Sequence, residues 1–380
     1  MLFRSTQKKY PKDTVLELSE AGRPLLVKYD LEAIEKEHKK EEFGESLEPG
    51  FWRYLPLLPI TNQASIISLG ESITPLIDIS QHYSETEVFI KDEGRLPTGS
   101  FKARGLAMAV AMAKEFGLNH LAIPTNGNAG AALAAYASRA GMKSTVYCPK
   151  DTPQINILET NLQGADTHLI DGLINDCGKL VLEGKAKYGW FDVSTLKEPY
   201  RLEGKKTMGL ELAEQFNWEL PDAIFYPTGG GTGLIGMWKV FHEMHAMGWI
   251  KKPFPRMYAI QSTGCAPIVK AFNHGNKFAE LWEKPSSLPW GIRVPVAVGD
   301  FLILEAVYES NGKAMAVEDS EVIEKRNQLA KQGIMLCPEG AATALALDQA
   351  IARGYVAKHD KVVLFNCASG LKYPMPSLSE

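Results

Sequence analysis

The sequence predicts an α/β fold built on parallel sheets whose two faces are covered by helices. Two observations carry this prediction. From Val88 onward, short apolar runs alternate with helix-like segments, which is the pattern of parallel strands joined by helices. The chain has 380 residues and 45% hydrophobic content, so it can fill the core of one large domain or of two domains that share a cleft.

The expected strands and helices follow one another along the chain. Ligands of such sheets bind at the carboxyl ends of the strands, where loops meet helix N-termini. Strands are expected at Glu87–Lys91, His120–Pro124, Ser144–Cys148, Asp166–Ile170, Ala223–Pro227, Met257–Gln261 and Lys361–Asn366. Helices are expected at Phe101–Phe116, Ala129–Ala140, Pro153–Gly164, Gly172–Lys187, Leu202–Phe216, Gly233–Met247, Asp300–Glu309, Ser320–Gln332 and Ala341–Arg353.

Residues 1–60 precede this alternation and are interpreted as an N-terminal arm. The charged run Glu32–Glu45 predicts one solvated helix. The aromatic cluster Phe51-Trp52-Arg53-Tyr54 suggests docking, either onto the body of the protein or onto a neighbouring subunit.

Composition and charge exclude several classes of function. A net charge of −4, from 41 basic and 45 acidic residues, provides no basic excess for a phosphate backbone, so nucleic acid is not an expected partner. The longest apolar runs, such as Leu55–Ile60, are far shorter than a membrane span, and Met1-Leu2-Phe3-Arg4 lacks the apolar core of a signal peptide. We therefore expect a cytoplasmic protein without membrane contacts.

The cysteines and histidines do not suggest a metal site or a disulfide framework. No C-x-x-C pair occurs among the cysteines, so neither a zinc ribbon nor paired disulfides are expected. His242-Glu243-Met244-His245 is one residue short of H-E-x-x-H, so the two imidazoles would not share a helical face as zinc ligands do. The five cysteines are Cys148, Cys177, Cys265, Cys337 and Cys367.

The first of four strand-to-helix loops contains Lys102. It reads Pro97-Thr98-Gly99-Ser100-Phe101-Lys102 and leads into the alanine-rich run Leu106–Lys114. An amine at a helix N-terminus, shielded by Phe101, is disfavoured as a cation by desolvation and by the positive end of the helix dipole. A neutral lysine can form a Schiff base; the alternative is an ordinary solvated lysine in a first helical turn.

The second loop is Pro124-Thr125-Asn126-Gly127-Asn128-Ala129-Gly130. Its glycines allow a ligand to approach the backbone closely. The Asn128 amide can hydrogen-bond a ring hydroxyl or a carboxylate, and the alternative is that Asn128 is an ordinary helix N-cap.

The third loop, Pro227-Thr228-Gly229-Gly230-Gly231-Thr232-Gly233, predicts a phosphate cradle. Its backbone N–H groups lie at the start of a helix, where they can bind an anion without a cation. No G-K-[ST] follows, so a nucleotide held with magnesium is disfavoured. The alternative is a flexible glycine turn.

The fourth loop, Phe365-Asn366-Cys367-Ala368-Ser369, follows the last expected strand. Cys367 and Ser369 are neutral polar groups that could face a ring nitrogen without protonating it; a buried, inert cysteine is the alternative. A lysine for an imine, an amide, a phosphate cradle and a neutral partner for a ring nitrogen together match the binding needs of pyridoxal 5'-phosphate.

These loops resemble the motifs of the tryptophan-synthase-β type (fold type II) of pyridoxal phosphate enzymes, and within it those of the threonine synthases. The resemblance extends from Ser68 to Pro374 and includes the C-terminal stretch Ser369–Pro374. It implies two parallel-sheet α/β domains with the cofactor in the cleft between them, and a homodimer in which the Phe51–Tyr54 cluster could be a contact. Cofactor contacts are implied for Lys102, Phe101, Asn128, Gly229, Gly230, Gly231, Thr232, Gly233 and Cys367.

The same resemblance implies domain boundaries and the absence of a metal. A larger cofactor-binding domain is expected at residues 61–104 and 204–380, and a smaller domain at residues 105–203. Gly22–Asp30 resembles the end of a zinc-ribbon-like segment found in relatives. No metal is expected there, because the ligand positions would be Phe3, Thr6, Leu18 and Ala21.

Substrate contacts are expected around a phosphate group. Arg201-Leu202-Glu203-Gly204-Lys205-Lys206-Thr207 is similar to the stretch whose arginine holds the substrate phosphate in the family, and Ser194 lies near the matching serine. A guanidinium binds phosphate in bidentate fashion. Ser100, Thr125 and Asn126 complete the expected substrate contacts.

Departures from the family pattern leave the reaction open among alternatives. Ala103, Asn126, Ala129 and Cys367 differ from residues common in threonine synthases, and the last two resemble serine and threonine dehydratases. The resemblance implies conversion of O-phospho-L-homoserine and water to L-threonine and phosphate, with Lys102 as catalytic residue. The alternatives are dehydration of serine or threonine, β-replacement on O-phosphoserine, and a non-enzymatic relative.

Overall fold

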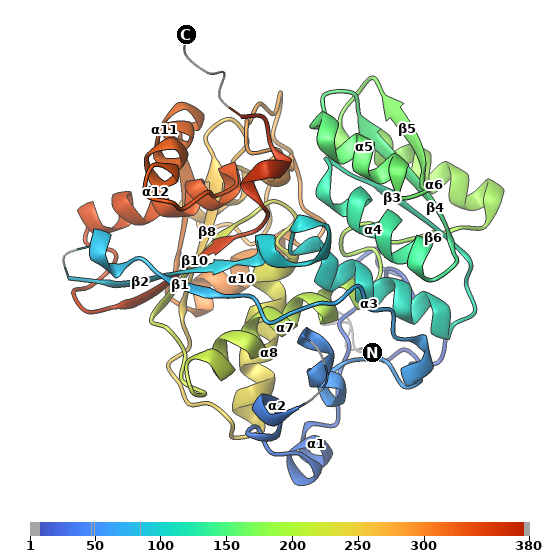
Figure 1. Cartoon of the computed structure of the whole chain (residues 1–380), viewed down its shortest axis with the longest axis horizontal. Helices are drawn as coiled ribbons and strands as arrows, with labels where there is room; N and C mark the ends of the chain where they lie inside the picture. Colours follow the sequence, from blue (N-terminus) through green and yellow to red (C-terminus); the bar gives the residue numbers. More distant parts are fainter. Residues whose placement is uncertain (1–7, 47, 49, 84, 376–380) are drawn as a thin grey trace.

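The computed structural model describes residues 8–46, 48, 50–83 and 85–375, and within them the strands form two sheets (Figure 1). One sheet has six strands in the order β1-β2-β10-β7-β8-β9, and the other has four in the order β5-β4-β3-β6. Neighbouring strands are parallel except for β1 and β2. The strands are β1 (Leu76–Asp78), β2 (Glu87–Asp92), β3 (His120–Pro124), β4 (Lys143–Pro149), β5 (Asp166–Ile170), β6 (Phe191–Asp192), β7 (Ala223–Pro227), β8 (Arg256–Ser262), β9 (Lys313–Val317) and β10 (Lys361–Asn366).

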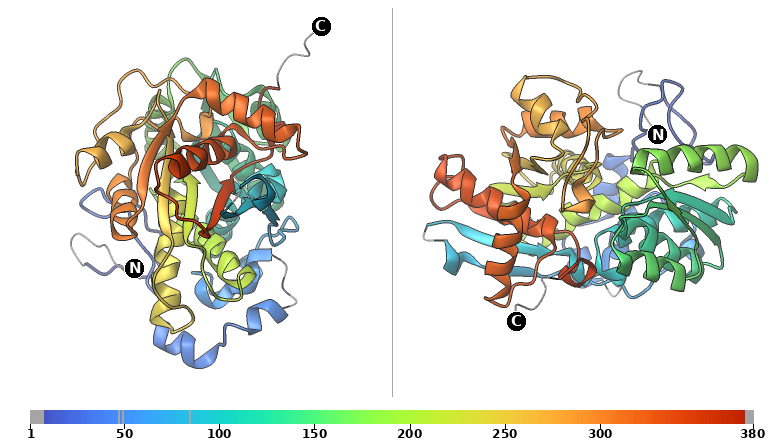
Figure 2. Two further views of the ribbon diagram at one scale, coloured as in Figure 1. Left: turned by 90° about the vertical axis from the view of Figure 1, so that its left-hand side faces the viewer. Right: turned by 90° about the horizontal axis from the view of Figure 1, so that it is seen from above.

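The α-helices connect these strands and cover the sheets. They are α1 (Leu31–Glu37), α2 (Glu42–Glu45), α3 (Lys102–Glu115), α4 (Asn128–Arg139), α5 (Gln154–Leu162), α6 (Ile174–Tyr188), α7 (Tyr200–Gln215), α8 (Thr232–Ala246), α9 (Pro267–Asn273), α10 (Asp300–Glu309), α11 (Asp319–Ala330) and α12 (Pro338–Ala352). The four-stranded sheet and α4, α5 and α6 form the green lobe in Figure 1, beside the lobe of the six-stranded sheet, and the view from above in Figure 2 separates the same two lobes.

Two buried helices lie between the lobes and connect them. α3 packs against both α4 and α7, and α7 packs against α8. The α3–α7 crossing is close because it is made at glycines: a Cβ on Gly204 would lie 2.1 Å from the carbonyl oxygen of Arg104. This crossing positions the N-terminus of α3, and therefore Lys102, between the two sheets.

Pairing of β2 with β10 positions two of the predicted loops. The register pairs Asp92 with Asn366 at the carboxyl ends of the strands, and Asn366 donates to Asp92 Oδ1 at 2.7 Å. Further along, Phe101 N–H donates to the Cys367 carbonyl oxygen at 2.9 Å. The loop that leads to Lys102 and the loop that contains Cys367 therefore run together.

The predicted α/β fold class with parallel sheets is confirmed. All seven expected strands are present within one residue at each end, and the nine expected helices are present within three residues. The prediction missed β1, β6, β9 and α9, which are short or have no clear apolar period. The proposed domain boundaries at residues 104/105 and 203/204 fall inside α3 and α7, and the division stays a prediction.

The single helix predicted at Glu32–Glu45 is wrong. The structure has two short helices there, and His38 adopts an extended conformation between them. The break follows from a tertiary contact: Phe43 is buried and packs with ring-centre distances of 5.4 Å to Tyr54 and 5.5 Å to Trp249. A continuous solvated helix could not place Phe43 in this core.

The aromatic cluster docks onto the body of its own chain. Phe51, Trp52 and Tyr54 are at most 1% exposed, so the idea that these rings form a dimer contact is wrong.

Of the four positions that correspond to zinc ligands in relatives, Phe3 and Thr6 lie outside the described residues. No helix in the described part of the chain has the length and apolar character needed to cross a membrane.

Candidate active site

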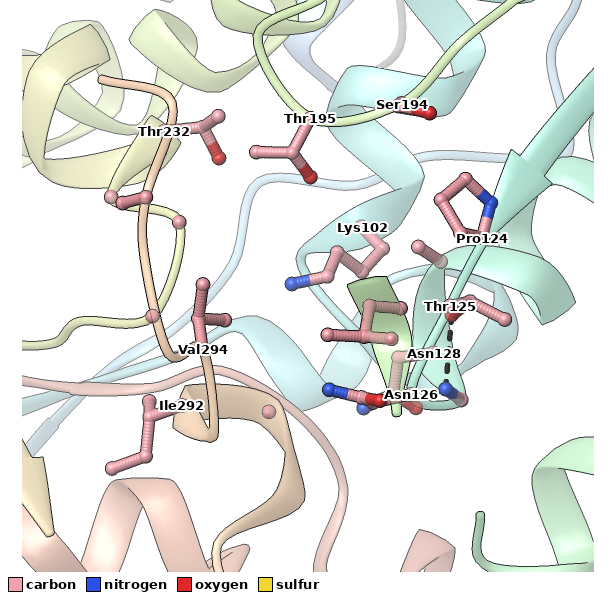
Figure 3. Close-up of a pocket in the computed structure, with 18 of the residues that line it drawn as sticks. Lys102, Pro124, Thr125, Asn126, Asn128, Ser194, Thr195, Thr232, Ile292 and Val294 are labelled. Carbon is pink, nitrogen blue, oxygen red and sulfur yellow. Dashed lines mark hydrogen bonds between the residues drawn. The ribbon is translucent and has the colours of Figure 1, made fainter. Parts of the chain in front are cut away.

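A cavity of about 410 Å³ is lined by residues that follow β3, β6, β7 and β10. It therefore lies at the carboxyl ends of strands from both sheets, which is where ligands of parallel sheets bind. All four predicted loops contribute to its wall. In Figure 3 the Lys102 side chain extends into the space between Thr232, Thr195, Val294 and Asn128.

Lys102 is the first residue of α3, as the sequence predicts. Burial, and after it the positive charge of Arg201, lowers the pKa of Lys102 to about 8. The amine lies 4.0 Å from the centre of the Phe101 ring, which also lines the cavity. This lowered pKa supports the expectation that the Lys102 amine reacts as a neutral group.

Asn128 lies at the start of α4, but it is not the helix N-cap, which is Gly127. The Asn128 amide instead donates to the Tyr373 hydroxyl at 3.0 Å, and its carbonyl oxygen is buried without a hydrogen-bond partner. A buried acceptor without a partner is costly. This oxygen is available to a ligand in the cavity.

The glycine-rich loop lines the cavity at the N-terminus of α8, and side chains are excluded from it. A Cβ on Gly231, whose φ is +74°, would lie 2.2 Å from Ile303 Cδ1. A Cβ on Gly233 would lie 1.9 Å from the Tyr226 hydroxyl oxygen. Gly229, Gly230 and Thr232 complete the wall. Bare backbone at a helix N-terminus is suited to an anion such as phosphate.

Cys367 lines the cavity and is 6% exposed. Burial raises the pKa of the Cys367 thiol to about 12, so the thiol is neutral at physiological pH. Such a group matches the predicted neutral partner of a ring nitrogen.

Three of the predicted substrate contacts lie on the cavity wall, namely Thr125, Asn126 and Ser194 (Figure 3). Thr125 Oγ1 accepts hydrogen bonds from Gly127 N–H at 2.9 Å and from Gly130 N–H at 3.2 Å, and so holds the second loop in shape. Asn126 Nδ2 donates to the Trp290 carbonyl at 3.4 Å.

Ser100 and Arg201, the other two predicted contacts, lie behind the wall. Ser100 is completely buried and pairs with Ala368 in an isolated antiparallel bridge. Arg201 Nη1 donates to the Val193 carbonyl at 2.7 Å, while Arg201 Nε is buried without a partner. Arg201 therefore acts on the cavity in this structure through its charge, which lowers the pKa of Lys102.

Several lining residues were missed by the sequence analysis. Thr195 packs against the glycine loop, since a Cβ on Gly230 would lie 2.8 Å from its Cγ2. Tyr226, Glu339 and Tyr373 also line the cavity, together with the segment at residues 291–298. Tyr226 is the last residue but one of an expected strand and could have been proposed from its position before the third loop. The others carry no strand-to-helix signal.

The residues present fit pyridoxal phosphate. The cavity holds an amine with a lowered pKa, a bare helix N-terminus, a neutral thiol and two buried oxygens without partners, Asn128 Oδ1 and Asn156 Oδ1. These groups meet the needs of an aldehyde, a phosphate and a polar ring. Among the described residues, no group of three or more His, Cys, Asp and Glu is placed to hold a metal ion.

Comparisons with known proteins agree with this reading. Residues 67–368 match the family model described as pyridoxal-phosphate dependent enzyme. The chain is 34% identical to threonine synthase of Methanocaldococcus jannaschii over 97% of this chain and 91% of that protein. It is 32% identical to threonine synthase of Methanosarcina acetivorans over 86% of this chain and 81% of that one.

Solved structures share the fold at lower identity. Threonine deaminase isoform 2 from Solanum lycopersicum superposes with a TM-score of 0.67 at 18% identity and covers 95% of both chains. O-ureido-L-serine synthase superposes with a TM-score of 0.68 at 20% identity, covering 85% of this chain and 97% of that one. The resemblance noted in the sequence is confirmed: the chain belongs to the fold type II family of pyridoxal-phosphate dependent enzymes, and its cofactor is pyridoxal 5'-phosphate.

Proposed function

We propose that this protein is a threonine synthase, a lyase that converts O-phospho-L-homoserine and water to L-threonine and phosphate. The observation that carries the proposal is that the similarity to threonine synthases spans 97% of the chain and includes the four loops around one cavity.

The cofactor-binding part of the proposal assigns one task to each loop. Lys102 Nζ would hold the cofactor aldehyde, Gly229–Gly233 would hold its phosphate at the α8 N-terminus, and Asn128 and Cys367 would contact the ring. When bound, pyridoxal phosphate supplies an electron-withdrawing ring that stabilises negative charge at the substrate carbons.

The chemistry of the chain itself centres on Lys102. Its amine, with a pKa of about 8, is suited both to removing and to returning protons near neutral pH, and we assign to it the proton transfers at Cα and Cβ of the substrate. Ser194 on the wall, with Arg201 behind it, is proposed to hold the substrate phosphate until it leaves. Thr125 and Asn126 are proposed to orient the rest of the substrate.

The alternatives from the sequence can be separated in one assay series. We would measure phosphate and threonine formation from O-phospho-L-homoserine, beside 2-oxo acid formation from threonine and serine and phosphate release from O-phosphoserine with a small nucleophile. The proposal predicts phosphate and threonine in equal amounts from the first substrate. Oxo acid formation without phosphate release would overturn it in favour of a dehydratase. The position of Arg201 behind the cavity wall would then explain why the site does not bind a substrate phosphate.

We also propose a homodimer in the cytoplasm. The five cysteines are unpaired and buried, as is usual for proteins of a reducing compartment. Because the Phe51–Tyr54 cluster is buried within one chain, the dimer contact is expected on another surface. Sedimentation analysis of the holoenzyme tests the dimer, and a monomeric mass would contradict it.

A further inference from the structure

Lys205 is a lysine on α7 that lies next to the start of α3. It is completely buried, and its amine donates to the carbonyl oxygen of Phe101, the residue before Lys102. The same amine lies 3.8 Å from the centre of the Phe101 ring, and the Lys102 amine lies 4.0 Å from that centre. Two amines from different helices therefore contact one phenyl ring, which lines the cavity.

The path of the Lys205 side chain depends on a glycine in α3. A Cβ at Gly105 would lie 2.9 Å from Lys205 Cε and 3.1 Å from the carbonyl oxygen of Arg201. A larger residue at position 105 would therefore displace the Lys205 amine. The close approach of α3 and α7 at this glycine lets Lys205 reach the first turn of α3.

Both backbone groups of Phe101 are held by residues outside α3. Its N–H donates to the Cys367 carbonyl oxygen at 2.9 Å, in the loop after β10. Its carbonyl oxygen accepts from Lys205 on α7. Phe101 is the N-cap residue of α3, so these two bonds fix the point at which the helix begins. Lys102 is the next residue, and its backbone is positioned by the same two bonds.

The surroundings of Lys205 favour a neutral amine. Burial, followed by the positive charges of Lys102 and Arg201, holds the pKa of Lys205 well below its usual range. Glu93 after β2 and Arg104 on α3 have smaller effects of opposite sign. An uncharged amine still has N–H groups to donate. Lys205 therefore acts on its neighbours through a hydrogen bond more than through a charge.

We propose that Lys205 is a positioning residue for Lys102: its amine anchors the Phe101 carbonyl, and so fixes where the Lys102 side chain enters the cavity. A buried amine costs free energy that an apolar residue would not. What the amine contributes is placement, because small displacements of a reacting group lower its rate by large factors. The inference concerns the lysine proposed to hold the cofactor and not the substrate, so it stands even if O-phospho-L-homoserine is not converted.

The test is the rate at which pyridoxal phosphate attaches to the full chain from which cofactor has been removed, followed by visible absorbance across a range of pH. Lys205→Met has a side chain of similar size but no donor. We expect attachment to be about 10- to 100-fold slower at every pH, with the midpoint of the pH dependence still near the Lys102 pKa of about 8. An unchanged rate would overturn the proposal.

The pH dependence separates placement from charge. If Lys205 acted as a cation, its removal would raise the pKa of Lys102. A midpoint displaced to higher pH with an unchanged maximal rate would therefore overturn the proposal. Complete loss of attachment would do the same, because Lys205 would then itself be the residue that carries the cofactor.

Lys205→Gln tests the donor directly. It keeps an N–H donor on a side chain that is one atom shorter, so its attachment rate should lie between those of the wild type and Lys205→Met. A rate no higher than that of the methionine variant would contradict a role for the hydrogen bond to Phe101.

Lys206→Met is the matched control for a purely structural role. Lys206 is also completely buried on α7, but its amine pairs with Glu203 and with Glu243, each at 2.9 Å. Its loss should lower the urea midpoint of unfolding and leave the attachment rate unchanged. Lys205→Met should show the reverse, an unfolding midpoint at or above that of the wild type together with slow attachment. The proposal would fail if Lys206→Met slowed attachment as much as Lys205→Met.

Discussion

Lys102 and Arg104 are two residues apart on α3, and their surroundings are opposite. Two residues along a helix correspond to about 200° of rotation, so the side chains lie in different environments. Arg104 bonds to Glu93 Oε2 at 2.6 Å and to Glu211 Oε1 at 2.6 Å, and all three side chains are completely buried.

Lys102 belongs to a region where polar groups are left without partners. Around its cavity, Asn128 Oδ1 and Asn156 Oδ1 are buried and unbonded, whereas Lys91 completes the Arg104 cluster with a 2.8 Å bond to Glu211. Buried polar groups in proteins are normally hydrogen-bonded. The paired buried charges around Arg104 hold the fold together, whereas the unpartnered polar groups around Lys102 are available to a ligand.

Substitution of Lys102 should abolish nearly all activity. Lys102→Met should lower turnover by about a thousandfold or more, because proton transfer at the substrate carbons loses its base. Chemical denaturation should show a stability equal to or above that of the wild-type apoprotein, since a buried amine is replaced by an apolar chain of similar size. Retained turnover would remove Lys102 from its role.

In the buried Arg104 cluster, Arg104→Met should destabilise the fold by about 3–5 kcal/mol, because Glu93 and Glu211 are left as buried charges without this partner. Lys270→Met is the matched control: the exposed 2.8 Å pair of Lys270 with Glu280 should contribute about 0–1 kcal/mol. Equal costs in urea unfolding would contradict the structural role of the Arg104 cluster.

A smaller effect is expected in the glycine loop. Gly231→Ala should weaken cofactor binding by about tenfold or more, since φ is +74° and the methyl group would meet Ile303. Gly275→Ala is the control, because Gly275 has a φ of +67° but open space around it. It should cost about 1 kcal/mol of stability and leave cofactor affinity unchanged, as measured by fluorescence titration.

The sequence predicts those parts of the candidate site that carry a local signal. The loops with Lys102, Asn128 and Gly229–Gly233 each follow a strand and begin a helix, so their position at one edge was predictable. Glu339 was not, because a proline followed by an acidic residue is an ordinary helix start. Its contact with Gly291 joins an irregular segment to α12, and no sequence period encodes such a contact.

The fold likewise has parts that local sequence patterns predict and parts that depend on long-range contacts. Buried strands such as His120–Pro124 are apolar runs bounded by turn residues, and the structure reproduces them. The split between α1 and α2 depends instead on the aromatic partners of Phe43, one of which is Trp249. Long-range packing overrode the local helix preference there.

The Lys102 amine should also give cofactor attachment a pH dependence. The neutral amine of Lys102 is the form that reacts with the cofactor aldehyde. The rate of cofactor attachment to the apoprotein should therefore rise with pH, with a midpoint near the Lys102 pKa of about 8. Arg201→Gln should move the midpoint to higher pH, because the Arg201 charge lowers this pKa. A midpoint that does not move would contradict the coupling.

Lys102, and no other buried amine, is proposed to carry the cofactor. Lys205 is the main alternative, because it is completely buried and its Nζ lies 3.8 Å from the centre of the Phe101 ring, which Lys102 also contacts. The most direct test is borohydride reduction of the holoenzyme followed by peptide mass spectrometry. We predict one cofactor per chain on the peptide that contains Lys102; label on the Lys205 peptide, or none at Lys102, would show that Lys102 does not carry the cofactor.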